Sequence, residues 1–340
     1  MASYIAQRKF LATLLGGTAV AWPLAARAQQ AAMPVIGFLG ALSASDWVSQ
    51  TEALRAGLRD LGYVEGKNIV IEFRWAQGNY DRLPDLASQL VRLKVDVLVT
   101  YGTPGTRAAK EATTTIPIVM NSGGDAVAMG LVASLNRPGA NITGSTQFGP
   151  EIVAKRLELL KEGVHSITQV GVLVNPDNPL TRGVGLEALE TTARTSKVLI
   201  QRFEVRERNE FESVFLTMAN KRVDAVVITA DAMFISNRRI IANLALKNRL
   251  PSTGFTEFAK AGGLIGYGVN DLEIYRRFAH FVDKILKGTK PADLPVERAT
   301  RFKLIINLKD CQGTRPHRAA NAARPRRRGD RVKRPAFIVC

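Results

Sequence analysis

Residues 95–100 read VDVLVT, and residues 223–229 read VDAVVIT. Each is a short apolar run rich in β-branched residues, which is typical of a buried strand in a parallel sheet. Two further pairs recur in the same way: PVIGFLG at 34–40 matches QVGVLVN at 169–175, and IP at 116–117 matches LP at 250–251. The three offsets are 128, 135 and 134 residues. The repetition predicts two lobes with the same order of strands and helices.

The segments around these runs alternate between strand-like and helix-like patterns. In the first half we expect strands over 34–40, 68–75, 95–101, 116–120 and 141–144. We expect helices over 53–61, 80–93 and 127–135, and another that begins at Thr103 with Pro104 in its first turn. Strands that alternate with helices form parallel sheets. The predicted fold class is therefore α/β, with two doubly wound, Rossmann-like lobes and a cleft between them.

The first 28 residues read as an export signal. Arg8-Lys9 precedes an apolar stretch of 13 residues, Phe10 to Trp22, which is too short to span a bilayer. Ala26-Arg27-Ala28 has the small-x-small pattern of a cleavage site, so we expect cleavage after Ala28 and a periplasmic product. A membrane anchor or a buried N-terminal helix is the alternative. The single Arg-Lys pair leaves open whether export is by the general or the twin-arginine route.

The charge distribution argues against a polyanionic partner. Of the formal net charge of +17, residues 310–340 carry +7 and the signal carries +3, so residues 29–309 keep +7. A mildly basic body of this length needs no nucleic acid. Both cysteines, Cys311 and Cys340, lie in the C-terminal tail, so the body depends on its hydrophobic core instead of disulfides.

Polar residues follow the predicted strands of both lobes. In open parallel sheets, ligands bind beyond the carboxyl ends of the strands, where hydroxyls and helix N-termini suit an anionic group. Asp125, Asp231 or Glu257 could hold an ammonium group, and Tyr101, Phe148, Phe255 and Tyr267 could form apolar walls. The alternative for each is a helix cap or a core residue. The predicted ligand-binding residues are Ser43, Ser45, Thr103, Thr106, Asp125, Asn175, Asn178, Asp231, Phe255, Glu257 and Tyr267.

Catalytic and metal-binding patterns are missing from the sequence. The three histidines, His165, His280 and His317, have no metal-ligand spacing, and no G-x-S-x-G or G-x-x-x-x-G-K-[ST] motif occurs. We therefore expect no catalytic residues, no metal and no cofactor. The rival hypothesis is a secreted α/β enzyme that uses carboxylates such as Asp125 and Asp231.

Residues 35–309 resemble the ABC transporter substrate-binding proteins of the group for tryptophan and tyrosine uptake. The resemblance depends on LGYVEGKN at 61–68, YDRLP at 80–84, ATTTIPIV at 112–119, LNRPGANITG at 135–144, KRLELL at 155–160, VLVNP at 172–176, AGGLIGYG at 261–268 and ILKGTKPADLP at 285–295. Two prolines typical of the family, after Asp125 and Asp231, are Ala126 and Ala232 here. The resemblance therefore does not identify the ligand.

The resemblance implies a type I periplasmic-binding fold and a mechanism of capture. A small molecule, such as an aromatic amino acid or a related carboxylate, would be enclosed by lobe closure and delivered to an ABC permease and its ATPase in the inner membrane. It further implies a monomer with hinges near 144–145 and 267–268 and a third crossing near 295–301. The expected first lobe is 29–145 with a returning helix at about 270–295, and the second is 146–269 with about 296–309.

The tail at 310–340 departs from the family pattern, because it is Arg-rich and has no amphipathic period. Back-translation with permitted codons and one base dropped yields a family-like ending with its own stop, so we interpret the tail as frameshifted. The nucleotide sequence tests this. A disordered basic tail is the alternative, and a nucleic-acid binder acting through its arginines is a third functional hypothesis.

Overall fold

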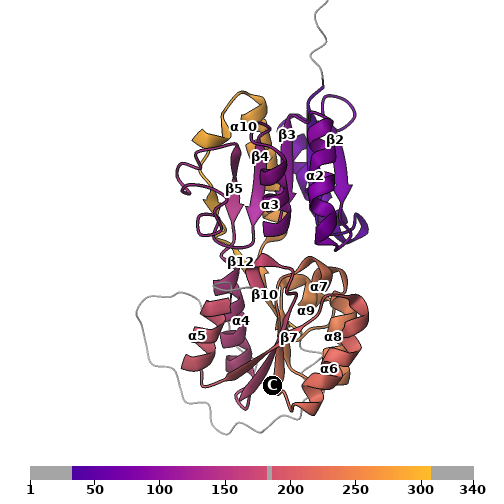
Figure 1. The fold of residues 1–340 in the computed structure, drawn as a ribbon, viewed down its shortest axis with the longest axis vertical. Helices are drawn as coiled ribbons and strands as arrows, with labels where there is room; N and C mark the ends of the chain where they lie inside the picture. Colours follow the sequence, from indigo (N-terminus) through magenta and orange to yellow (C-terminus); the bar gives the residue numbers. More distant parts are fainter. Residues whose placement is uncertain (1–32, 182–185, 308–340) are drawn as a thin grey trace, which may run out of the picture. The chain divides into compact units, whose positions relative to one another are not determined.

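The computed structural model describes residues 33–181 and 186–307. The predicted signal at 1–28 and the tail at 310–340 lie outside these residues. The described chain forms two six-stranded sheets, each covered by helices on both faces (Figure 1). The predicted α/β class with two lobes is confirmed.

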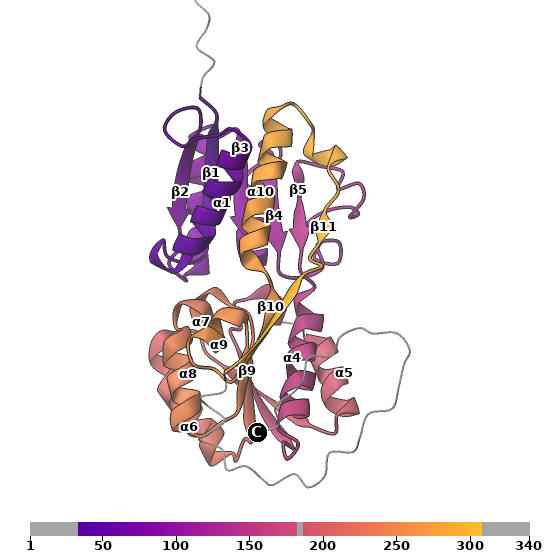
Figure 2. The ribbon, with the colours of Figure 1, turned by 180° about the vertical axis from the view of Figure 1, so that it is seen from behind.

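The first sheet has the strand order β11-β5-β4-β3-β1-β2, and all of its pairs are parallel. Its strands are β1 (Val35–Gly40), β2 (Val70–Trp75), β3 (Val97–Tyr101), β4 (Ile118–Ser122), β5 (Ile142–Thr146) and β11 (Glu297–Arg298). Helices α1 (Val48–Asp60) and α10 (Asp271–Leu286) pack side by side on one face (Figure 2). Helices α2 (Leu83–Arg92) and α3 (Thr103–Ala112) cover the other face.

The close approach of α1 and α10 requires a glycine. A Cβ atom at Gly57 of α1 would lie 2.8 Å from the backbone oxygen of Arg276 in α10. The two helices share one apolar cluster with β1, in which Phe38 and Phe278 are buried. This packing attaches α10 to the first sheet, although it follows the second lobe in sequence.

The second sheet has the order β12-β10-β9-β8-β6-β7, and only β12 runs antiparallel to its neighbour. Its strands are β6 (Gln169–Val174), β7 (Leu199–Glu204), β8 (Ala225–Ile228), β9 (Ser252–Gly254), β10 (Ile265–Val269) and β12 (Phe302–Ile306). Helices α4 (Gly149–Gly163) and α5 (Glu187–Thr195) share a core with one face, and α6 (Phe211–Asn220) and α8 (Arg238–Lys247) share a core with the other. The short helices α7 (Ala232–Ser236) and α9 (Thr256–Lys260) follow β8 and β9.

Three segments connect the two sheets. The first joins β5 to α4 at 147–148, the second joins β10 to α10 at Asn270, and the third joins β11 to β12 at 299–301. They are tied together, because Ala299 N–H donates to the Thr146 oxygen over 3.0 Å and Asn270 N–H donates to the Arg301 oxygen over 3.2 Å. The predicted boundary assigned all of 296–309 to the second lobe, whereas in the structure β11 pairs with β5 of the first sheet.

The predicted helix over 127–135 is wrong, because this segment forms turns. A single helical turn closes with a hydrogen bond from Met129 N–H to the Asp125 oxygen over 2.9 Å. Gly130 then adopts a φ of 65°, and Leu131 N–H returns to the Ala126 oxygen. A glycine in the left-handed region ends a helix, so the apolar spacing beyond it reflects packing of irregular chain.

Candidate functional site

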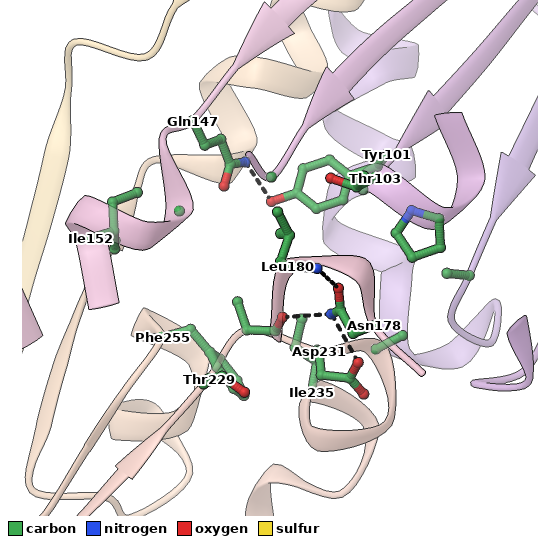
Figure 3. Close-up of a pocket in the computed structure, with 18 of the residues that line it drawn as sticks. Tyr101, Thr103, Gln147, Ile152, Asn178, Leu180, Thr229, Asp231, Ile235 and Phe255 are labelled. Atoms are coloured by element: carbon green, nitrogen blue, oxygen red, sulfur yellow. Dashed lines mark hydrogen bonds between the residues drawn. The ribbon is translucent and has the colours of Figure 1, made fainter. Parts of the chain in front are cut away.

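A pocket of about 130 Å³ lies beyond the carboxyl ends of strands from both sheets (Figure 3). Residues after β1, β3, β4 and β5 line it from the first sheet, and residues after β6, β8, β9 and β10 line it from the second. This is the position at which doubly wound sheets bind ligands.

Aromatic rings form the wall of the pocket on the side of the first sheet. Trp47, Trp75, Tyr80 and Tyr101 all line it. Trp47 and Tyr101 meet edge to face with 5.4 Å between ring centroids, and buried Tyr275 stacks on Tyr101 at the same distance. Trp47 Nε1 donates to the hydroxyl of Tyr275. The rings therefore support one another through these contacts.

The hydroxyl of Tyr101 connects two of the crossing segments. It donates to Asp271 Oδ1 over 2.9 Å. It also accepts from Gln147 Nε2 over 2.8 Å (Figure 3). Burial, together with the charge of Asp271, raises the pKa of Tyr101 well above its ordinary value. Tyr101 is therefore a neutral hydrogen-bond donor at physiological pH.

Arg156 of α4 places a buried cation in the pocket wall. Its side chain is 2% exposed, and it donates through Nε to the Tyr267 oxygen over 2.8 Å and through Nη1 to the Ile228 oxygen over 3.3 Å. Among the described residues, no carboxylate lies within salt-bridge distance of its guanidinium group. Burial lowers its pKa to about 10, so the group stays charged at neutral pH.

Glu257 and Asp271 are two of the three carboxylates that line the pocket. Glu257 lies in α9 and accepts from the Thr256 hydroxyl over 2.9 Å, and Lys260 Nζ lies 3.6 Å from it. Asp271 is the first residue of α10 and accepts from Tyr101. Burial and the charge of Glu257 raise the pKa of Asp271 to about 7.

Asp231 joins the two lobes through a saturated set of hydrogen bonds. Its carboxylate accepts from Tyr80 Oη over 2.7 Å, from Asn178 Nδ2 over 3.0 Å, from Asn175 Nδ2 over 3.2 Å and from Met233 N–H over 2.9 Å. Burial raises its pKa, and these four donors act in the opposite direction. Tyr80 belongs to the first lobe, so this contact crosses between the sheets.

Residues 39–314 match the family model described as ABC transporter substrate binding protein. The match covers most of the chain. The protein belongs to this family.

Similar proteins include a tyrosine-binding protein of Clostridioides difficile (strain R20291), which is 27% identical over 251 residues, or 74% of this chain and 72% of that protein. A Streptococcus pneumonia ABC domain solved in complex with L-Trp is 25% identical, with a TM-score of 0.75 over 82% of this chain and 93% of that one. The ligand-free, open structure of a substrate-binding protein with adhesive properties from Clostridium difficile is 26% identical, with a TM-score of 0.61 over 85% and 97%. At nearly equal identity, this chain has a higher TM-score with the L-Trp complex, 0.75, than with the open Clostridium difficile structure, 0.61.

Five of the predicted ligand-binding residues line the pocket of this substrate-binding protein. They are Thr103, Asn178, Asp231, Phe255 and Glu257. They come from both lobes. Thr103 follows β3 and Asp231 follows β8, so loops at matching positions of the sequence repeat meet at the pocket.

The other six predicted residues do not line the pocket. Ser43 and Ser45 bond to one another over 2.9 Å, and the Thr106 hydroxyl donates to the Gly102 oxygen. Asp125 accepts from the N–H groups of Val127 and Ala128, so it has the capping role that was the alternative. Asn175 Nδ2 donates to Asp231 Oδ1, and the ring of Tyr267 stacks on that of Phe302 with 5.7 Å between centroids.

Several lining residues were not predicted, and Arg156 is the most informative of them. It lies in the segment KRLELL at 155–160, one of the stretches that resemble the family. Its neighbours on the helix surface, Val153, Leu157 and Leu160, are all buried. A charged residue on the apolar face of an amphipathic helix is a signal that could have identified it.

The described residues contain no group of three or more His, Cys, Asp or Glu side chains that could hold a metal ion. No helix within 33–181 or 186–307 is long and apolar enough to cross a membrane.

Proposed function

We propose that this protein captures an aromatic amino acid or a closely related aromatic carboxylate in the pocket and delivers it to an ABC permease and its ATPase. The single observation that carries the proposal is the buried Arg156 guanidinium, which faces the pocket without a carboxylate partner among the described residues.

The physical argument is the cost of a buried charge. Two backbone carbonyls accept from Arg156, and among the described residues no carboxylate forms a hydrogen bond or salt bridge with its guanidinium, although the charges of Glu257 and Asp271 act on it from a longer distance. An unpaired buried charge is strongly unfavourable, and a partner that supplies a carboxylate removes part of that cost. A ligand carboxylate matches the planar, forked geometry of the guanidinium.

The ring wall supports the aromatic part of the ligand. Trp47, Trp75 and Tyr101 offer faces and edges against which a planar ring packs favourably. A cavity of about 130 Å³ is close to the size that holds a single benzene ring in an engineered protein core. The tyrosine-binding relative and the L-Trp complex support the same class of ligand.

Capture requires the lobes to close on the ligand, and the contacts across the cleft support this mechanism. Tyr80 donates to Asp231, while Ser236 Oγ and Arg238 Nη1 donate to Asp46 over 3.0 Å and 3.2 Å. A ligand favours the closed form by the free energy that it gains from contacts with both lobes at once. The protein acts in the periplasm, for which the predicted signal at 1–28 is the support.

The alternative of a secreted enzyme has less support. It depended on Asp125 and Asp231, and Asp125 caps a turn outside the pocket. Asp231 accepts four hydrogen bonds, and such a carboxylate is a poor general base because its lone pairs are already occupied. We therefore propose binding without turnover.

A ligand screen on the purified chain tests the proposal. Calorimetry and thermal unfolding would be measured with L-tryptophan, L-tyrosine, L-phenylalanine, their deaminated acids and glucose. A ligand present at about 100 times its Kd stabilises the folded state by about 2.7 kcal/mol, so the aromatic compounds should raise the melting temperature and glucose should not. If none of the aromatic compounds binds, the proposed function is wrong.

A further inference from the structure

The pocket contains a cation and two carboxylates within one charged cluster. Arg156 comes from α4, Glu257 from α9 and Asp271 from the start of α10. The charges act on one another, because both carboxylates raise the pKa of Arg156. A cluster with both signs of charge matches a ligand that also carries both.

We propose that Asp271 binds the ammonium group of the ligand, so that the site selects zwitterionic α-amino acids over the corresponding deaminated acids. This inference rests on the proposed function and narrows its ligand class. Arg156 would hold the carboxylate of the same ligand, and the aromatic wall of Trp47, Trp75, Tyr80 and Tyr101 would hold its ring.

Asp271 is a better ammonium ligand than the other two carboxylates of the pocket. Asp231 already accepts four hydrogen bonds, so it has little capacity left for a ligand. Glu257 already has a cationic neighbour, Lys260. Within the part of the chain that the structure describes, Asp271 accepts one side-chain hydrogen bond, from Tyr101, and forms no salt bridge.

The charges around Asp271 support this assignment. The groups that face it are Glu257 and Lys260 from α9, Arg156 from α4, Tyr101 from β3 and Tyr275 from α10 itself. Burial and Glu257 raise its pKa to about 7, while Tyr101, Lys260 and Arg156 lower it. A ligand ammonium would favour the ionised carboxylate, so binding at pH 7 should release part of a proton.

Asp271 also lies where a bound ammonium group can affect lobe closure. It follows Asn270 in the second crossing segment, and its partner Tyr101 accepts from Gln147 in the first. Occupation of Asp271 therefore acts on a hydrogen-bonded chain that joins two of the three connections between the lobes.

Two pairs of probes test the selection. L-Tryptophan would be compared with indole-3-propionate, and L-tyrosine with 3-(4-hydroxyphenyl)propionate, since each pair differs only in the ammonium group. The unmodified protein should prefer the amino acids by about tenfold or more, because a deaminated acid leaves the carboxylate of Asp271 unpaired. Asp271→Asn should remove most of this preference by weakening amino-acid binding.

Asp283→Asn is the matched control. Asp283 lies on the same helix and also accepts from a tyrosine hydroxyl, that of Tyr63 over 3.1 Å, but it does not line the pocket. This variant should keep the preference for amino acids, whatever its effect on stability. Calorimetry in two buffers of different ionisation enthalpy should detect proton release at pH 7 in the unmodified protein and in Asp283→Asn, but not in Asp271→Asn.

The results separate the two proposals. If aromatic ligands bind but Asp271→Asn leaves the ratio within each pair unchanged, the assignment of Asp271 is wrong and the proposed function stands. A loss of affinity for both members of each pair to the same extent points to a merely structural role and also contradicts the assignment. If no aromatic amino acid or acid binds, both proposals fail.

Discussion

The two lobes share a topology but supply different chemistry to the pocket. Of the described residues that line it, the first sheet and its loops provide four of the five aromatic rings, and the second lobe provides three of the four charged side chains. Phe255 is the ring from the second lobe, and Asp271 is the charge from α10, which packs on the first. Neither lobe alone offers both a ring wall and a charged cluster, so the proposed recognition of an aromatic amino acid would require both.

Equivalent positions of the repeat illustrate this difference. Strand β3 (Val97–Tyr101) ends with Tyr101, whose ring belongs to the aromatic wall. The matching strand β8 (Ala225–Ile228) is followed by Asp231, whose carboxylate caps α7 and accepts a hydrogen bond from Tyr80 of the opposite lobe. The two lobes thus place a loop at the same position, but the side chain in that loop is an aromatic ring in the first lobe and a carboxylate in the second.

The largest expected effect is the loss of the charge supplied by the second lobe. Arg156→Gln should weaken the binding of aromatic amino acids by about 2–5 kcal/mol, because the ligand carboxylate would be buried without its partner. Isothermal calorimetry measures this. Lys155→Gln, next to it on the exposed face of α4, is the control and should bind normally. Unchanged affinity in Arg156→Gln would show that the charge division between the lobes has no part in binding.

A contact that joins the two lobes should have the next largest effect. Tyr80→Phe removes the hydroxyl that donates to buried Asp231, and hydrogen bonds to charged groups contribute about 1.5–3 kcal/mol. Affinity should fall, since this bond forms only when the lobes meet.

Tyr63→Phe is the control for this contact. Its hydroxyl also donates to an aspartate, Asp283, but both residues belong to the first lobe. Chemical denaturation should therefore report lower stability for Tyr63→Phe with no change in affinity. Equal losses of affinity in the two variants would argue that the contact between lobes is not specific to capture.

The ring wall of the first lobe should contribute less. Trp75→Leu removes an aromatic face from the pocket, and aromatic pairs are worth about 0.5–1.5 kcal/mol beyond their buried area. Competition binding should show a larger loss for L-tryptophan than for an aliphatic amino acid. Phe73→Leu is informative beside it, because Phe73 stacks on Trp75 with 5.6 Å between centroids but does not line the pocket.

A separate effect, which does not depend on binding, concerns the stability of the protein without ligand. The raised pKa of Asp271, about 7 against an ordinary 3.8, means that the folded state holds a proton that the unfolded state has lost between these pH values. This contribution to stability is present at low pH and is lost as the pH rises through 7. Asp271→Asn avoids the loss, so thermal unfolding should find it more stable relative to the unmodified protein at pH 8 than at pH 4. The opposite trend would contradict the raised pKa.

Much of the fold was predictable because it depends on local patterns. The apolar runs at 34–40, 95–101 and 169–175 contain β1, β3 and β6, since a strand buried on both faces must be apolar along its length. The helix expected over 127–135 was wrong because Gly130 ends it after one turn, and apolar spacing alone does not reveal a left-handed residue. Thr103, Asn178, Asp231, Phe255 and Glu257 were predictable because they follow strands at the edge where both sheets open.

Arg156 was not predicted although it interrupts the apolar face of its helix, and nothing in the immediate sequence of Asp271 marks that residue. Arg156 lies in the middle of a helix, where a basic residue usually lies on the solvated face. Asp271 begins a helix, where an aspartate usually stabilises the helix dipole. Only the packing of α4 and α10 brings their side chains into one pocket.

The sequence by itself determined two α/β lobes, the loops at which a ligand could bind and the resemblance to a transport family. Hydrophobic periodicity and loop position depend on neighbouring residues along the chain, so they can be read without a structure. The tertiary structure decided which side chains share the pocket. Arg156, Tyr101 and Asp271 are separated by 55 and 115 residues along the chain, and pocket chemistry depends on distances that only the packed lobes define.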